Sequence, residues 1–144
     1  VGGVVIVVLG IGAISGVQYL KYRYSPEYKT YKEAQRLIKE YNEDPYGGNT
    51  PEETLQLFID ALKKGDIDLA SKYFVMEKWE EINKRFNGLD ENQISSMVEK
   101  LQRTELTKQE NTAFFTLVDK NRVVESELVM IKHRVNKRWK ISEL

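Results

Sequence analysis

Few side chains in this sequence are of the types that do chemistry at neutral pH. The chain has one histidine, His133, and no cysteine. Without cysteine, these 144 residues hold no thiol nucleophile, disulfide, Cys-ligated zinc or iron–sulfur cluster. A single imidazole is too few for a typical histidine metal site. A Ser-His-Asp triad would have to use His133 as its base, placed beside an acid. We therefore predict no metal site, no cofactor and no catalytic residue.

His133 is the one candidate for a general base. It lies in a predicted strand and alternates with Val129 and Ile131, so its ring can face the inside of the domain. A general base also needs a partner within hydrogen-bonding reach and a tuned pKa. The nearest acids on that strand, Glu125 and Glu127, are several residues away. We predict that His133 and Trp139 lie in a pocket or at its rim, and that the protein is not an enzyme.

The basic residues near His133 form the only long stretch of charge without an acid. Trp139 is interleaved with these residues, which are Lys132, Arg134, Lys137, Arg138 and Lys140. Such a stretch suits anionic headgroups or nucleic acid, but in a hairpin it more often forms a solvated outer face. Since 22 Lys and Arg balance 22 Asp and Glu over the chain, we predict no nucleic-acid partner.

The first 20 residues carry no charge, whereas the rest of the chain is rich in charge. About 20 apolar residues in a helix span the roughly 30 Å of a bilayer core, where ionised side chains are costly. We predict a transmembrane or packing helix over 1–20; a buried core segment is the alternative. Gly12 and Gly16 have the small-xxx-small spacing that seats a second helix.

Aromatic and basic residues of the type found at a headgroup interface follow directly: Tyr19, Lys21, Tyr22 and Arg23. Membrane lipid is therefore a predicted partner. Basic residues on this flank would place the rest of the chain in the cytoplasm by the positive-inside rule. Because the sequence begins with Val1, we expect a leader upstream whose charges set the orientation.

Residues 21–46 have the pattern of an amphipathic helix rich in tyrosine. Apolar residues recur at steps of three and four: Tyr24, Tyr28, Tyr31, Ala34, Ile38 and Tyr41. Ser25 and Pro26 either restart this helix as N-cap and first residue or only kink it. The tyrosine stripe either packs on the following domain or forms a stalk that meets neighbouring copies. Residues 47–49 are the predicted linker.

The remaining residues, 50–144, change from a helical period to a period of two. Thr50, Pro51 and Glu53 predict a capped helix start with a capping box, and Gly65 predicts its end. Three further helices are expected from Asp66, around 79–87 and over 90–103. Strands are expected over 104–109, 112–119, 122–135 and 138–143, with turns at 120–121 and 136–137. Helices followed by an antiparallel sheet predict an α+β fold.

Two stretches of this region resemble a known superfamily. Residues 50–66 (TPEETLQLFIDALKKGD) and 68–74 (DLASKYF) are similar to the opening of nuclear transport factor 2-like, or SnoaL-like, domains. Residues 135–141 (VNKRWKI) are similar to their closing hairpin. The resemblance implies a cone, in which helices lie against a strongly curved antiparallel sheet. No position matches the acid–base residues of the enzymes in that superfamily.

The resemblance is closest to membrane-anchored bacterial members outside the cytoplasmic membrane, which implies an extracytoplasmic domain. We therefore expect a single-pass anchored, non-catalytic domain that binds a ligand or an envelope protein. The alternative is a pilin-like subunit whose N-terminal helix lies in the core of an extracellular filament and associates with its own copies. Against this alternative, Val5 stands where type IV pilins usually carry Glu.

Overall fold

The computed structural model describes residues 18–119 and 121–144. The chain divides into two compact units, Val1–Glu43 and Asp44–Leu144. Most of the apolar segment 1–20, including Gly12 and Gly16, lies outside the described residues. Of the helices described, none has both the length and the apolar character needed to cross a membrane.

In the first unit, residues 18–23 are helical and a turn at Tyr24 and Ser25 precedes helix α2 (Pro26–Glu43). The Ser25 hydroxyl accepts a hydrogen bond from the backbone N–H of Tyr28 at 3.2 Å. Pro26 takes the first helical position, where its missing N–H costs nothing. Ser25 and Pro26 therefore restart the helix, which decides between the two predicted roles of this pair.

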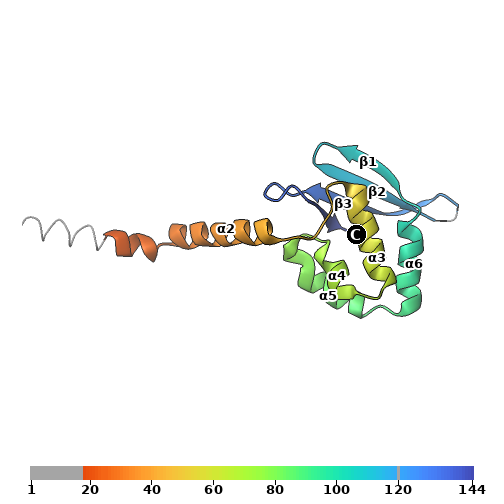
Figure 1. The fold of residues 1–144 in the computed structure, drawn as a ribbon, viewed down its shortest axis with the longest axis horizontal. Helices are drawn as coiled ribbons and strands as arrows, with labels where there is room; N and C mark the ends of the chain where they lie inside the picture. The colour runs from red at the N-terminus through yellow and green to blue at the C-terminus, as the bar shows by residue number, and fades with distance from the viewer. Residues whose placement is uncertain (1–17, 120) are drawn as a thin grey trace, which may run out of the picture. The chain divides into compact units, whose positions relative to one another are not determined.

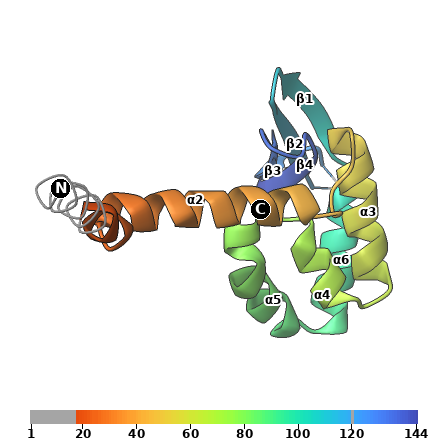
Figure 2. The same cartoon turned by 60° about the vertical axis from the view of Figure 1, so that its left-hand side comes forward.

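The second unit places its helices first in the chain and its sheet afterwards. The helices are α3 (Pro51–Lys63), α4 (Ile67–Lys72), the 3-10 turn η1 (Met76–Lys78), α5 (Trp79–Asn87) and α6 (Glu91–Leu101). The strands are β1 (Glu105–Gln109), β2 (Thr112–Val118), β3 (Val124–Lys132) and β4 (Trp139–Glu143). They form an antiparallel sheet in the order β1-β2-β3-β4, and the helices lie on one side of it (Figures 1 and 2). The predicted α+β class is confirmed.

The helix ends follow the predicted capping chemistry with one difference. The Thr50 hydroxyl accepts a hydrogen bond from the Glu53 N–H at 3.1 Å, and Pro51 begins α3. The Glu53 carboxylate accepts from the N–H of Asn49, one residue before the position that a capping box requires. Gly65 has φ +70°, the left-handed conformation that commonly ends a helix.

The core lies between the helices and one face of the sheet. Phe58, Phe74 and Phe86 form its aromatic centre, with ring centroids 5.5–6.0 Å apart. Alternate residues of the strands cover them from the sheet: Ala113, Phe115, Leu117, Leu128, Met130 and Ile141. All of these side chains are buried. The helix-facing side of the sheet is therefore filled by apolar side chains.

Strand β4 is covered on both faces and along its free edge. Ile141 donates a backbone hydrogen bond to Tyr73 and accepts one from Val75, both at 2.9 Å, and a parallel bridge pairs it with Phe74. Further along the edge, the Trp139 N–H donates to the Gly48 carbonyl at 3.0 Å. Gly48 and the segment 73–75 thus supply hydrogen-bond partners along the edge of this strand.

The predicted linker is part of this packing. Gly47 and Gly48 of the segment 47–49 are buried, and the unit begins at Asp44. The Thr54 hydroxyl accepts from the Gly48 N–H at 2.8 Å and donates to the Trp139 carbonyl at 3.1 Å. Glycine has a steric role here, since it allows the backbone to lie against β4.

The predicted strand over 122–135 is too long at both ends. Strand β3 begins at Val124 and ends at Lys132, so His133 lies in the connection to β4 and not in the strand. The predicted two-residue turn at 136–137 is also wrong. The His133 carbonyl accepts from the Lys137 N–H at 3.0 Å, which closes a longer loop ahead of β4.

We expect Gly47→Ala to destabilise the domain more than Gly65→Ala does. Both glycines have positive φ, which costs an L-residue roughly 1–2 kcal/mol. A methyl group on Gly47 would also clash with the Trp139 carbonyl oxygen, whereas nothing lies within 4 Å of one on Gly65. Urea unfolding of the two variants measures the difference, and equal losses would contradict the close approach of Gly47 to β4.

Candidate functional site

The most unusual chemistry in the described residues is a buried ion pair between Lys140 and Asp44. Lys140 Nζ lies 2.5 Å from Asp44 Oδ2, and both side chains are fully inaccessible to solvent. Nζ also donates to the Lys72 carbonyl at 3.1 Å, and Asp44 Oδ1 accepts from the Tyr46 N–H at 2.9 Å. Among the described residues, only the ammonium group of Lys140 compensates the burial of Oδ2.

Aromatic rings surround the ammonium group of this pair. Nζ of Lys140 lies 5.9 Å from the ring centroid of Tyr46 and 5.6 Å from that of Trp79. The ammonium group of Lys72 lies 5.2 Å from each of the same two rings. The rings supply cation–π attraction to both lysines, and the indole N–H of Trp79 donates to the Phe74 carbonyl at 2.8 Å.

Burial lowers the pKa of Lys140 below its ordinary value, and the nearby Arg138 acts in the same direction. The hydrogen bond and charge of Asp44 oppose this lowering. An amine of lowered pKa is a nucleophile where a substrate reaches it. Here the side chain is enclosed on all sides, so we assign the pair to structure: it fastens the start of the domain to β4.

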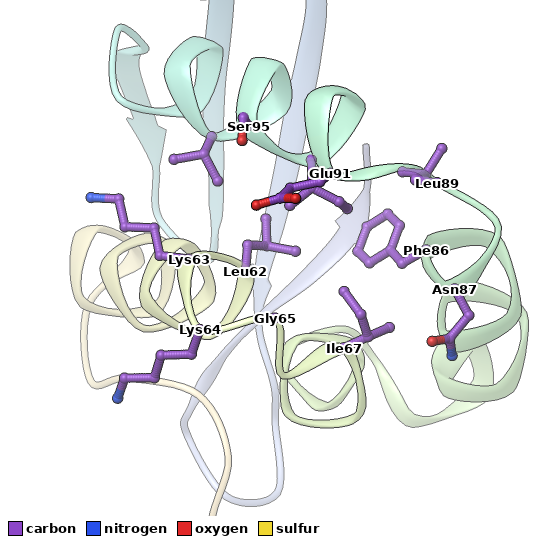
Figure 3. A pocket seen from close by; sticks show the side chains of 12 residues that line it. Leu62, Lys63, Lys64, Gly65, Ile67, Phe86, Asn87, Leu89, Glu91 and Ser95 are labelled. Carbon is purple, nitrogen blue, oxygen red and sulfur yellow. The ribbon is translucent and has the colours of Figure 1, made fainter.

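An open groove lies among the ends of the helices. Its volume is about 550 Å³, within the range of small-ligand sites. Leu62, Phe86 and Val98 line it with buried side chains, and Ile67, Leu89 and Ile94 line it with half-buried ones. Figure 3 shows Leu62, Ile67 and Phe86 pointing toward a common space. The groove is therefore an apolar surface in contact with solvent.

Polar side chains lie only around the mouth of this groove. Glu91, Ser95 and Asn87 are exposed lining residues on one side, and Lys63 and Lys64 are exposed at the end of α3. In Figure 3 the two lysines extend outward. An apolar floor with a polar mouth is the arrangement that binds a largely apolar molecule or an apolar side chain of a partner.

Sequence reasoning missed this groove because its lining comes from the ends of four helices. The sequence predicts each of these helices separately and does not show how their ends pack together. The available signal was the cluster of helix ends at Gly65 and Leu89, where α3 and α5 stop and their apolar faces are left incompletely covered. Only the packing of α6 across both ends brings these faces together (Figure 3).

The two predicted pocket residues have different environments. Trp139 is only 1% exposed and belongs to the core, with the ammonium group of Lys108 lying 5.2 Å from its ring centroid. His133 is half-buried and lines a second cavity of about 360 Å³ at the β3–β4 hairpin. The structure therefore does not bring the two residues into one pocket.

Most of the predicted interface and helix-packing residues that the structure describes are exposed. Tyr22 and Tyr28 pack edge to face at 5.3 Å, and the guanidinium group of Arg23 lies 5.9 Å from the ring centroids of Tyr19 and Tyr28. On the apolar stripe, Tyr24, Tyr31 and Ile38 are 77%, 53% and 43% exposed, whereas Tyr41 is buried. Lys21 is exposed as well.

No family model matches the chain, nor does any curated protein or solved structure. Within residues 18–119 and 121–144, no group of three or more His, Asp and Glu side chains could hold a metal ion.

We expect Asp44→Asn and Lys140→Met each to cost about 3–5 kcal/mol of unfolding free energy, because each leaves a buried group without its partner. The double variant should recover most of that loss, which a double-mutant cycle measures. Lys100→Met is the matched control. It breaks a 2.6 Å pair with Glu125 whose side chains are about 40% exposed, so it should cost about 0–1 kcal/mol. Single losses no larger than the control would contradict the structural role of the buried pair.

Proposed function

We propose that the protein is a non-catalytic binding domain carried on a single-pass membrane anchor, with the domain of residues 44–144 outside the cytoplasm. The observation that supports binding is the apolar groove of about 550 Å³ among the helix ends. Anchoring rests on the uncharged segment 1–20 and on the aromatic and basic residues that follow it. The extracytoplasmic placement and a nuclear transport factor 2-like relationship rest on the sequence resemblance.

The groove suits a ligand that is largely apolar with a polar end. Burying a half-exposed apolar surface contributes roughly 25 cal/mol per Å² removed from water, so an apolar body gains most at the half-buried residues Ile67, Leu89 and Ile94. Glu91, Ser95 and Asn87 at the mouth offer hydrogen-bonding groups for a polar end. The occupant is either a small molecule or an apolar side chain of an envelope protein.

Methyl NMR of the full chain in zwitterionic nanodiscs tests this role, with indole as the probe. We expect saturable shifts of the methyl signals of Leu62, Ile67 and Ile94 and no shift at the core residues Leu128 and Ile141. Ser95→Trp, an exposed substitution at the mouth, should block the groove and remove these shifts.

Glu99→Trp is the matched control, since it adds the same ring to an exposed position of α6 that does not line the groove. It should leave the titration unchanged. Absent shifts at the groove methyls, or equal shifts in the Ser95→Trp protein, would contradict a binding role for the groove.

A second function is supported by the exposed apolar stripe of α2. Tyr31 and Ile38 are large apolar side chains exposed on this helix, and Tyr24 is exposed in the turn that precedes it. Exposed apolar stripes on helices are surfaces at which copies of a chain associate. A pilin-like subunit, with this helix in the core of an extracellular filament, uses the stripe in that way.

Cysteine variants separate the two functions, because the native chain has no cysteine. If copies meet along the stripe, Tyr31→Cys should form disulfide-linked dimers under mild oxidation on cells. Lys29→Cys, exposed elsewhere on α2, should remain monomeric. Monomers in both variants, together with an absence of fibres in material sheared from cells, would exclude the filament.

Labelling of Lys29→Cys by an impermeant maleimide on intact cells tests the extracytoplasmic placement.

A further inference from the structure

The cavity at the β3–β4 hairpin is built by two turns at one end of the sheet. The Asn111 carbonyl, in the β1–β2 turn, accepts from the Lys132 N–H at 2.8 Å, and this bond joins the turn to the end of β3. The hairpin closes where the His133 N–H donates to the Arg138 carbonyl at 2.8 Å. Asn111, Lys132, His133, Arg134 and Lys137 line the space between the turns.

Hydrogen bonds fix the backbone of the hairpin loop that carries these basic residues. The Arg138 N–H donates to the Asn136 side chain at 3.1 Å. Lys137 has φ +61°, a backbone angle that is rare for residues other than glycine. The Arg138 guanidinium group is used elsewhere, donating to the Gly47 carbonyl at 2.7 Å. Three cationic side chains remain at the cavity: Lys132, Arg134 and Lys137.

These three cations have no acidic partner among the described residues. No carboxylate lines the cavity, and none lies within 4.0 Å of their charged nitrogens. Other basic side chains of the domain, such as Lys100, Arg103 and Lys140, do have carboxylate partners. Like charges around one cavity repel one another, and a bound anion removes that repulsion.

At this cavity His133 acts as a hydrogen-bonding group and not as a fourth cation. Burial lowers the pKa of His133 below its ordinary value, the charge of Lys140 acts in the same direction, and Glu77 and Asp44 oppose it. The neutral ring accepts a hydrogen bond at Nδ1 from the Val135 N–H, at 3.3 Å. The imidazole therefore helps to shape the loop while the three cations supply the field.

We propose that the β3–β4 hairpin cavity is a binding site for a phosphate group, held by Lys132, Arg134 and Lys137 with the Asn111 amide as a neutral donor. A guanidinium fork and ammonium groups are the usual partners of phosphate oxygens. The volume of about 360 Å³ admits a phosphate group together with part of the molecule that carries it. The same chemistry serves the headgroup of an anionic lipid or a soluble phosphorylated compound. The site shares no lining residue with the helical groove, so it does not depend on the function proposed for that groove.

Amide NMR of the full chain in phosphatidylcholine nanodiscs tests the site. Titration with inorganic phosphate should shift the signals of Asn111, Arg134 and Lys137 saturably if soluble phosphate compounds bind. If a lipid headgroup is the ligand, the same signals should shift when phosphatidylglycerol replaces part of the lipid, with little response to phosphate. Either pattern supports the site and identifies the source.

Variants decide whether the response belongs to the cavity. Arg134→Gln with Lys137→Gln changes two exposed side chains and should weaken the response roughly tenfold, the loss expected for charge-assisted hydrogen bonds. Lys63→Gln with Lys64→Gln removes the same charge at the end of α3 and should leave the response unchanged. No shift in either arm, or equal weakening by both double variants, would overturn the proposal.

Discussion

The buried ion pair between Asp44 and Lys140 joins the first residues of the domain to β4. The packing of the first residues against the strand depends on this pair. Neither charge is tolerated alone in such a place, because an unpaired buried ion is far more costly than an exposed one. The segment that follows Asp44 must therefore lie against β4, with Gly47 close to the strand and Tyr46 beside the ammonium group. The beginning of the domain is consequently a fixed part of its packing and not a free tether.

Both candidate binding surfaces lie away from the centre of the domain. Phe58, Phe74 and Phe86 fill the space between the helices and the sheet, which leaves no room for a ligand at that place. The apolar groove lies where helices end, and the cationic cavity lies where strands turn. The two surfaces differ in chemistry because helix ends leave parts of apolar faces uncovered, whereas the hairpin presents its loop side chains to water.

Local sequence rules were sufficient for most elements of the domain. Thr50, Pro51 and Gly65 predicted the limits of α3, and the change of period after Arg103 predicted the start of the sheet. The rules failed where a residue has two structural uses. Proline and glycine in 45–48 are typical of a linker, but they also suit a segment that packs closely against a strand. Here tertiary contacts place the segment against β4. Lys140 was predicted on a solvated face because nothing in its neighbourhood indicates Asp44, which is distant in sequence. The groove was missed for the same reason, since each of its helices appears complete by itself.

The position of β4 in the chain has a consequence for biosynthesis. Its contacts reach far back, because the Thr54 hydroxyl bonds to a carbonyl 85 residues later and Lys140 bonds to a carbonyl 68 residues earlier. Contacts of such long sequence separation form late and slow the folding of a domain. While the ribosome is still making β4, the apolar residues of the β2–β3 hairpin and the carboxylate of Asp44 lack their final partners. During that interval the nascent domain exposes apolar surface that β4 later covers, and such surface makes an incompletely folded chain prone to aggregation.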